Sequence, residues 1–291
     1  MSPTSARPGL ASTTSSYTDW DLHLFGLWLG ARTLPSSPIA GLKSLALPVE
    51  YIRCVETRYV LQHLDVRPGQ RVLDIGSPKL LSLFLAARLH AEVHATDLVD
   101  YFRDTYSRYS RVALGADQGR FCVRQEDARH LSYSRDRFDG VFSISAIEHI
   151  PDDGDSVAIQ EIARVLAPGG TACLTVPWSD HGYLEEFKPR GDPDAYWAEG
   201  HGERVFFQRA YDRDSLERRL LRPSGLSLVD LSFWGERALP VENVILNRRV
   251  PRIARMLLYP AHIALARLFL RRLTETETSH KKVACFTLRK V

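Results

Sequence analysis

The chain has 291 residues, and its 38 Lys and Arg against 35 Asp and Glu give a net charge of +3. A hydrophobic fraction of 44% with 25% charged residues is typical of a globular protein and excludes an intrinsically disordered one. The small net charge gives no indication of nucleic-acid binding. The four cysteines lie far apart in the sequence, which excludes a CxxC metal knuckle and a dense disulfide framework; they are Cys54, Cys122, Cys173 and Cys285.

The N-terminal part differs in composition from the rest. Residues 1–16 are rich in Ser, Thr and Pro, so we predict a disordered tail. They lack the continuous apolar core of a secretory signal, and the sequence therefore predicts a cytoplasmic protein that is not exported. Residues 17–47 carry scattered aromatic side chains before a Pro/Ser stretch, which indicates an N-terminal helical extension. Residues 48–291 form the predicted main domain.

From residue 48 onward, short apolar runs alternate with segments of helical periodicity. Predicted helices cover 48–64, 78–89, 100–114 and 155–166, and predicted strands cover 71–75, 92–96, 121–124, 138–145 and 171–176. This alternation predicts βαβ units, with helices on both faces of a parallel sheet. Ligands of such sheets bind at the carboxyl ends of the strands, so functional residues are expected just after each strand.

The loop after the first predicted strand runs DIGSPK over residues 74–79. Gly76 permits a tight turn and close approach of a ligand to the backbone. Ser77 is a predicted N-cap and Pro78 a predicted first helical residue. The dinucleotide-binding fingerprint has three glycines where this loop has one, and Pro78 lacks an N–H that a pyrophosphate needs. The loop favours a ligand without phosphates, and an ordinary strand-to-helix turn is the alternative.

Acidic residues follow the next two predicted strands. Asp97 lies about 20 residues beyond the glycine loop, a position from which a carboxylate accepts hydrogen bonds from both ribose hydroxyls. Asp127, in the segment Glu126-Asp127-Ala128, is a candidate acceptor for an adenine amino group. A helix cap or a turn is the alternative role for each of these carboxylates.

Small residues and a carboxylate–imidazole pair follow the fourth predicted strand, in the segment SISAIEHI over 143–150. Ser145 leaves room for a ligand, and Glu148 and His149 stand near the same edge. A histidine can act as a general base near neutral pH, and His149 is the first candidate. His181 and His201, in the following segment, are alternatives. A purely structural role is the competing interpretation for each histidine.

Residues 48–177 resemble the class I S-adenosylmethionine-dependent methyltransferases. The resemblance rests on an ordered series of motifs: VLDIG at 72–76, Asp97, Asp127, FDGVFS at 138–143, EHI at 148–150 and EIARVLAPGG at 161–170. It implies an α/β fold, a Rossmann-like doubly wound sheet of seven strands, mostly parallel, with an antiparallel C-terminal hairpin and helices on both faces. Residues 226–233 and 283–288 are then the sixth and seventh strands.

The resemblance also implies S-adenosyl-L-methionine as cofactor and assigns candidate residues to its parts. These are Asp74, Gly76 and Ser77 for the methionine part, Asp97 for the ribose, Asp127 and Ala128 for the adenine, and Ser145 near the transferred methyl. Leu98 is a further candidate cofactor-binding residue. The pair Ser77-Pro78 replaces the second glycine that is usual in the family. We hypothesise that Lys79 compensates by pairing with the cofactor carboxylate. No metal site is predicted.

Two segments bear on the methyl acceptor. Residues 178–210 mix aromatics, histidines and glycines, and we predict a substrate-facing insertion there. Residues 248–273 are apolar with flanking arginines, but their uncharged run is too short to span a bilayer. We predict a helix that either packs on the domain or a dimer partner, or lies on anionic lipid as a peripheral membrane contact.

The sequence therefore predicts an S-adenosylmethionine-dependent methyltransferase that moves a methyl group by in-line displacement to a small-molecule, lipid or glycan acceptor. The alternatives are an NAD(P)-dependent oxidoreductase and a catalytically silent binding protein on the same fold. No Asn/Asp-Pro-Pro-Tyr or Pro-Cys motif indicates methylation of nucleic-acid bases, so no nucleic-acid partner is expected.

Overall fold

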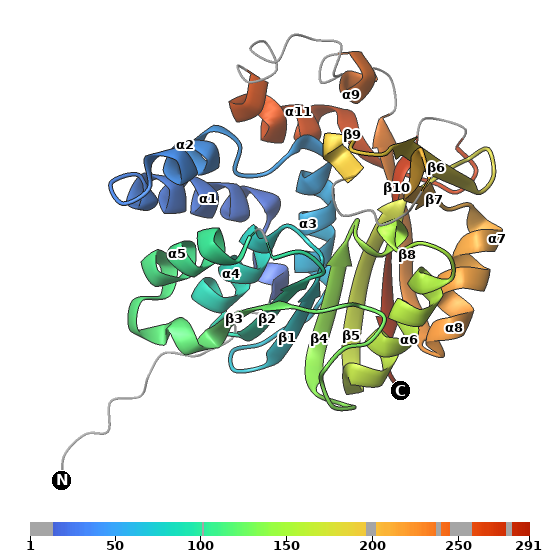
Figure 1. The fold of residues 1–291 in the computed structure, drawn as a ribbon, viewed down its shortest axis with the longest axis horizontal. Helices are drawn as coiled ribbons and strands as arrows, with labels where there is room; N and C mark the ends of the chain where they lie inside the picture. The colour runs from blue at the N-terminus through green and yellow to red at the C-terminus, as the bar shows by residue number, and fades with distance from the viewer. Residues whose placement is uncertain (1–13, 101, 196–201, 237–239, 245–257, 278–280) are drawn as a thin grey trace.

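The computed structural model describes residues 14–100, 102–195, 202–236, 240–244, 258–277 and 281–291. Within them the main sheet has eight strands in the order β3-β2-β1-β4-β5-β10-β8-β9, and β6 and β7 form a separate two-stranded sheet (Figure 1). The strands of the main sheet are β1 (Arg71–Ile75), β2 (Glu92–Asp97), β3 (Phe121–Gln125), β4 (Phe138–Ile144), β5 (Leu166–Pro177), β8 (Ser227–Glu236), β9 (Leu270–Leu273) and β10 (Lys281–Arg289). The small sheet pairs β6 (Leu184–Pro189) with β7 (Arg204–Ala210).

Strands β1 to β5 are mutually parallel, and β10 is antiparallel to both β5 and β8. The chain leaves β1 toward β2 and β3 on one side and returns to β4 and β5 on the other. The topological switch point therefore lies between the carboxyl ends of β1 and β4, where ligands of open α/β sheets bind. The predicted Rossmann-like, mostly parallel sheet is confirmed. The eighth strand, β9, was not predicted, because its residues 270–273 were assigned to the apolar helix.

Helices cover both faces of the sheet (Figure 1). On one side are α3 (Tyr51–His63), α4 (Lys79–Arg88) and α5 (Arg103–Leu114), with α1 (Asp19–Thr33) and α2 (Pro38–Ala46) packed outside them. On the other side are α6 (Gly154–Val165), α7 (Arg213–Leu216) and α8 (Arg222–Ser224). Short helices α9 (Val241–Val244) and α11 (His262–Phe269) lie near the upper edge in the view of Figure 1.

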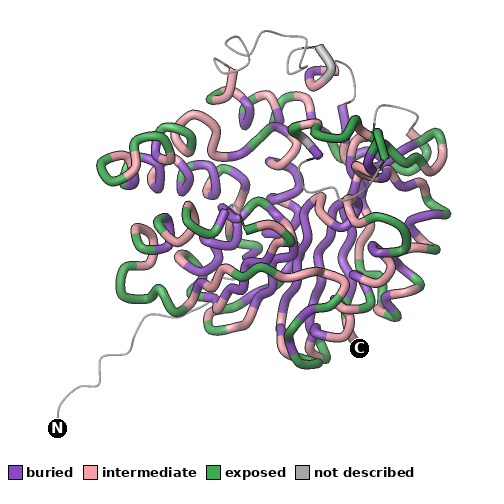
Figure 2. Tube along the Cα trace, viewed as in Figure 1, coloured by how far each residue is buried: buried purple, intermediate pink, exposed green. Residues whose placement is uncertain are grey.

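Two apolar clusters form the core, one on each face of the sheet. Successive strand side chains alternate between them: in β4, Val141 joins the α6 side and Phe142 the α3 side. In β5, Cys173 and Leu174 divide in the same way. The strands are buried along most of their length, as Figure 2 shows in purple. Burial on both faces explains why the parallel strands appear in the sequence as continuous apolar runs.

Two boundaries differ from the predictions. Residues 1–13 of the predicted disordered tail lie outside the described residues, but Thr14–Ser16 form a 3-10 turn in which Thr14 is buried and its N–H bonds to the carbonyl of Val66. The strand predicted to begin at residue 171 begins at Leu166 instead, so that residues 168–170 belong to β5. The Pro-Gly-Gly sequence at 168–170 favours a turn, but pairing with the C-terminal segment overrides it, because the Gly169 N–H donates to the Lys290 carbonyl at 2.8 Å.

The predicted helix over 248–273 is only partly visible, since residues 245–257 lie outside the described part. The rest is a 3-10 turn (Tyr259–Ala261), α11 and β9. Helix α11 packs on α1 and α3: Ile263 is buried, and Arg267 donates to Asp19 Oδ1 at 3.0 Å. Asp19 also accepts two hydrogen bonds of 2.9 Å from Arg58. This part of the segment therefore packs on the domain. No helix in the described part of the chain has the length and apolar character needed to cross a bilayer.

Candidate active site

The loops after β1, β2 and β3 meet at one edge of the sheet. Strand pairing sets Ile75 opposite Thr96, and the Gly76 N–H donates to the Thr96 carbonyl at 2.9 Å. The Glu126 N–H donates to the Asp97 carbonyl at 2.9 Å. Asp97, the predicted ribose-binding residue, therefore lies beside the glycine loop.

Gly76 forms the tight turn at the switch point. Its φ is +67°, a left-handed conformation that favours glycine. A Cβ at this position would stand 2.6 Å from the Cβ of Ala146, which follows β4. The ends of β1 and β4 are therefore in close contact here, and only a glycine fits between them.

The buried side chain of Asp74 holds the loop after β1 in its conformation through hydrogen bonds. Its side chain is fully buried, and it accepts hydrogen bonds from the Ser77 N–H at 3.0 Å and from Ser82 Oγ at 2.5 Å. Burial raises the pKa of Asp74, against the lowering effect of Lys79 and these hydrogen bonds. Asp74 thus fixes the shape of the loop through its own partners.

Ser77 does not cap helix α4, contrary to the prediction. Pro78 occupies the N-cap position, and Ser77 Oγ instead accepts a hydrogen bond from the Ile144 N–H at 2.8 Å. The Ser77 hydroxyl therefore connects the loop after β1 to the end of β4, since these two strand ends lie next to each other at the switch point. Ser77 is buried, so its part in the site is to hold the loop.

Lys79 also departs from the hypothesis made for it. Its ammonium donates to the carbonyls of Ser77 and Thr96, each at 2.8 Å. It lies 3.4 Å from Asp74 Oδ2 and 3.6 Å from Asp97 Oδ2, and only 3% of its side chain is exposed. The ammonium is therefore engaged by groups of the protein itself, between the two strand-end carboxylates.

The carboxylates of Asp97 and Asp127, which follow β2 and β3, are more accessible to solvent than that of Asp74. Asp97 has an 18% exposed side chain, and its Oδ1 accepts from the Val99 N–H at 3.3 Å. Leu98, next to it, is exposed. Asp127 and Ala128 are both half-buried. The guanidinium of Arg129 donates hydrogen bonds of 2.7 to 3.1 Å to the Asp127 carboxylate. Arg129 lowers the pKa of Asp127, which is therefore ionised at neutral pH.

Ser145, after β4, belongs to a polar cluster that the sequence did not indicate. Its hydroxyl donates to Glu56 Oε1 at 2.5 Å, and Thr175 of β5 donates to the same oxygen at 2.7 Å. Arg53 pairs with the other Glu56 oxygen at 2.5 Å. Helix α3 thus delivers a buried carboxylate to the ends of β4 and β5. The one sign of this in the sequence was Glu56 itself, a charged residue among the apolar positions of the predicted helix over 48–64.

Glu148 and His149 lie in a 3-10 turn (Ile147–His149) next to this cluster. Neither carboxylate oxygen of Glu148 has a hydrogen-bond partner in the described structure, and burial raises its pKa to about 8. His149 Nδ1 bonds to the Phe207 carbonyl at 2.6 Å, and burial lowers the pKa of His149 to about 4. At neutral pH both side chains are therefore uncharged, although His149 Nε2 lies 3.9 Å from Glu148 Oε1.

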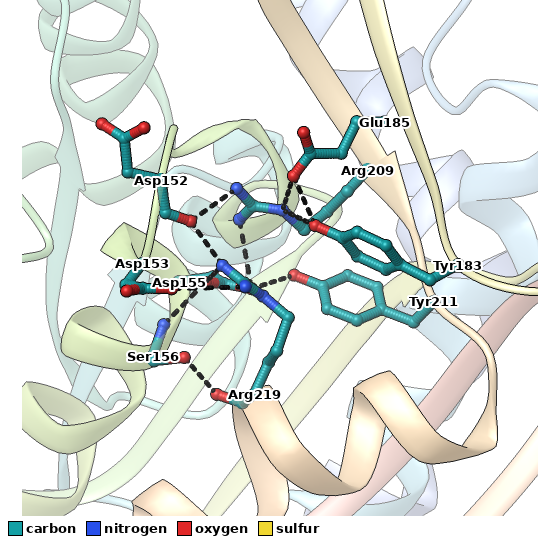
Figure 3. A network of polar contacts seen from close by, with 9 residues as sticks. All are labelled: Asp152, Asp153, Asp155, Ser156, Tyr183, Glu185, Arg209, Tyr211 and Arg219. Carbon is teal, nitrogen blue, oxygen red and sulfur yellow. Dashed lines mark hydrogen bonds and ion pairs between the residues drawn. The ribbon is translucent and has the colours of Figure 1, made fainter.

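The carbonyl that holds His149 belongs to the β6–β7 hairpin, which a buried ionic network fastens to α6 (Figure 3). Arg209 of β7 is fully buried and lies 3.1 Å from Asp155 Oδ2. Asp155 also accepts from Tyr211 at 2.7 Å and from Arg219 at 2.7 and 2.9 Å. This network positions the predicted substrate-facing segment over the ends of β4 and β5.

His181, one of the alternative candidate bases, is not part of this arrangement. His181 is exposed on the loop before β6, and its backbone N–H donates to Ser179 Oγ. His201 lies outside the described residues. Trp178, the first residue of the predicted substrate-facing insertion, is buried against Phe233 with ring centroids 4.4 Å apart. Among the described residues no group of three or more His, Cys, Asp or Glu side chains is arranged to hold a metal ion.

Comparison with known proteins gives an independent view of this site. Residues 73–174 match the family model described as a methyltransferase domain. The chain is 34% identical over 123 residues to the methyltransferase GfsG of Streptomyces halstedii, covering 40% of this chain and 41% of that protein. It is 30% identical over 124 residues to a ubiquinone biosynthesis O-methyltransferase of Alkalilimnicola ehrlichii, covering 42% and 48%. The chain thus spans about half the length of the curated relatives it matches.

Solved structures show the same fold at low sequence identity. Geranyl diphosphate C-methyltransferase from Streptomyces coelicolor, crystallised with S-adenosyl-L-homocysteine, is 13% identical with a TM-score of 0.52, covering 82% of this chain and 78% of that one. The [4+2]-cyclase SpnF is 18% identical with a TM-score of 0.50, covering 83% and 84%. The matched family model spans β1 to β5, the strands that carry the site, so this part of the chain is similar to methyltransferase domains and the fold is the Rossmann-like methyltransferase fold.

Proposed function

We propose that this protein is a methyltransferase that uses S-adenosyl-L-methionine to methylate a small molecule. The observation that carries the proposal is the placement of Gly76, Asp97 and Asp127 after three adjacent parallel strands, beside the switch point. The fold alone does not decide the reaction, because a neighbour with the same fold is named a cyclase.

The residues fit an adenosyl ligand at this edge. Asp97 presents a partly exposed carboxylate, which can accept from both hydroxyls of a ribose. Asp127 is ionised and half-buried, and stands one strand further along for an adenine amino group. Asp74, Ser77 and Gly76 give the loop its fixed shape. The loop has one glycine and Pro78, which does not suit the pyrophosphate of a nicotinamide cofactor.

Bound at this edge, the cofactor supplies a methyl group already activated on a sulfonium. The chain then has to hold the acceptor in line with that methyl group, and such positioning is worth roughly 7–11 kcal/mol of the barrier. Ser145 stands at the end of β4 with its hydroxyl held by Glu56, so its oxygen can still accept a hydrogen bond from an acceptor. The cluster of Glu56, Thr175 and Ser145 therefore forms the floor of the proposed acceptor site.

His149 is the proposed general base for an acceptor that must lose a proton. Its Nδ1 carries the hydrogen that the Phe207 carbonyl accepts, so Nε2 is the basic nitrogen. The imidazole is neutral at pH 7, because burial lowers its pKa to about 4. Glu148, protonated at neutral pH, stands 3.9 Å from Nε2 and can exchange a proton with it. His181 remains the alternative base, on an exposed loop.

The acceptor is proposed to be a small molecule with a hydroxyl group, since relatives of this chain are named O-methyltransferases. A lipid-linked or glycan acceptor and a peripheral membrane contact are the further possibilities, and sedimentation with anionic vesicles tests them. The packing of α11 on α1 and α3 favours a role inside the protein for residues 262–269.

Titration calorimetry with S-adenosylhomocysteine and with NAD⁺ tests the proposal directly. We expect the first ligand to bind and the second not to bind. Asp97→Asn should weaken S-adenosylhomocysteine binding by roughly 10- to 100-fold, because hydrogen bonds to a charged group are worth about 1.5–3 kcal/mol. Asp104→Asn, on the exposed side of α5, is the matched control and should leave the affinity unchanged. Binding of NAD⁺ in place of the adenosyl ligand would reject the methyltransferase assignment.

Methyl transfer itself is measured with methyl-labelled S-adenosylmethionine and a panel of small phenols and catechols. Labelled product that depends on His149 supports the base assignment. Cofactor binding without transfer to any member of a wide panel would favour the silent binding protein.

A further inference from the structure

Helix α2 is largely apolar, yet little of it is covered. Its sequence PIAGLKSLA holds one charged residue, Lys43, and of its nine residues only Gly41 is buried. Ile39 is 85% exposed and Leu42 is 58% exposed. A helix that is apolar all round is normally buried, in a core or in a membrane. The described part of the fold therefore leaves the outer side of α2 without a covering partner.

The inner side of α2 is fixed in place by close contacts. Gly41 approaches Gly30 of α1 so closely that a Cβ on Gly41 would stand 2.9 Å from the Gly30 carbonyl oxygen. The hydroxyl of Tyr109, on α5, donates to the Ala40 carbonyl at 2.8 Å. These contacts hold α2 at the outer edge of the molecule, where Figure 2 shows it mostly in green and pink. Its outer side is therefore a constant part of the protein surface.

Exposed apolar side chains of α1 extend this outer side. Ile39 and Leu42 lie three residues apart and share one face of α2. Trp20 and Leu24 lie four residues apart on the adjacent helix α1, and both are exposed. Their positions on α1 are opposite to that of Leu22, which is buried in the core. Both helices thus turn apolar side chains away from the core, and we call Trp20, Leu24, Ile39 and Leu42 the outer apolar face.

Exposed positive charges accompany the outer apolar face. Arg32 stands at the end of α1, Lys43 lies on α2, and Arg108 of α5 contacts the start of α2. Helix α2 has no acidic residue, and of the two on α1, Asp19 is buried and Asp21 is half-buried. The exposed charge of these two helices is therefore positive.

We propose that the outer apolar face is a docking surface for a bilayer that contains anionic lipid. Tryptophan and leucine side chains combined with lysine and arginine are typical of helices that lie in the plane of a membrane interface. A second copy of the chain fits less well, because pairing the two faces would set their positive charges against one another. An anionic lipid surface supplies both an apolar layer and the opposite charge. The proposal does not depend on the reaction that the protein catalyses.

The proposed contact is peripheral. Helix α2 has nine residues, too few to span a bilayer, which needs about 20. A helix in the interface enters only to the depth of its apolar side chains, about 5–10 Å. The contact also differs from the one expected for residues 248–273, since the described helix of that segment packs on α1 and α3.

Sedimentation of the full chain with lipid vesicles tests the proposal. We expect binding to vesicles of phosphatidylcholine and phosphatidylglycerol in equal parts, and much weaker binding to phosphatidylcholine alone. Ile39→Asp should weaken binding to the mixed vesicles about tenfold or more, because burial of one such side chain accounts for that factor and anionic lipid repels the new carboxylate. Val229→Asp is the matched control, since Val229 is an exposed apolar residue on β8, and should leave binding unchanged.

Lys43→Gln tests the contribution of charge separately. It should weaken binding to the mixed vesicles about fivefold, because one lysine near an anionic surface is worth about that factor. Binding to pure phosphatidylcholine should not change. Added salt should reduce the difference between the wild type and this variant, since salt screens the surface charge.

A wild type that stays in the supernatant with the mixed vesicles overturns the proposal, and so does an Ile39→Asp variant that binds like the wild type. A wild-type dimer that Ile39→Asp dissociates in sedimentation velocity also overturns it, because a second copy then covers the face. Circular dichroism checks that each variant is folded, and Ile39→Gln replaces Ile39→Asp if that variant does not fold. Titration with S-adenosylhomocysteine measures the proposed function independently, so that either proposal can fail without the other.

Discussion

Replacing Glu148 by Gln should make the protein more stable, and increasingly so as the pH rises. Glu148 is fully buried, neither of its oxygens has a hydrogen-bond partner in the described structure, and its pKa is raised to about 8. The unfolded chain loses the Glu148 proton above its ordinary pKa of 4.5, whereas the native state keeps it up to about 8. Stability therefore falls as the pH increases through this window.

The magnitude follows from the size of the shift. Each pH unit well inside the window between the two pKa values costs about 1.4 kcal/mol. Because the group is partly titrated at both ends of the window, the wild type loses about 3.5 kcal/mol between pH 5 and pH 8 through this one group. The glutamine side chain of the variant resembles the protonated carboxyl group and does not titrate, so the variant is free of this loss. The contribution of His149, whose pKa is lowered to about 4, appears below pH 6.5 in both proteins and largely cancels in their difference.

Urea unfolding of both proteins at pH 5, 6, 7 and 8 measures this difference. Glu161→Gln is the matched control, because its hydrogen bonds to Arg164 lower the pKa of Glu161. That variant should be less stable than the wild type by an amount that is constant over this pH range. A Glu148→Gln difference that is equally flat would show that Glu148 is ionised in the native state, and would refute the reasoning.

Two further predictions concern the parts that hold the site together. Asp155→Ala should cost about 3–5 kcal/mol of unfolding free energy, because it leaves the buried guanidinium of Arg209 without its nearer counter-ion, while Asp153→Ala, whose side chain is 88% exposed, should cost less than about 1 kcal/mol. Equal effects of the two variants in urea unfolding would contradict the role of the network. Gly76→Ala should destabilise the protein by about 2–4 kcal/mol and abolish cofactor binding, since φ is +67° and the new Cβ would stand 2.6 Å from Ala146. Gly119→Ala, where a Cβ meets nothing within 4 Å, is its control, and thermal unfolding with calorimetry checks both.

The sequence was sufficient for the parallel half of the sheet and for the residues at its carboxyl edge. The central strands β1, β2 and β4 are short runs buried on both faces, and this pattern depends only on neighbours in the chain. Because parallel strands end at a common edge, the order of strands and loops along the chain is enough to place Asp97 next to Gly76. The extra strand β9 was missed, because four residues after a helical pattern give no separate signal.

Tertiary structure decided the proposed acceptor side and the charges of its residues. Glu56 reaches Ser145 only because α3 packs across β4 and β5, and Phe207 reaches His149 only because the Arg209 network fastens the hairpin to α6. The inward position of the Lys79 ammonium was likewise invisible in the sequence. Contacts between distant segments, and the desolvation that shifts a pKa, depend on which surfaces the folded chain removes from water, and local patterns do not contain that information.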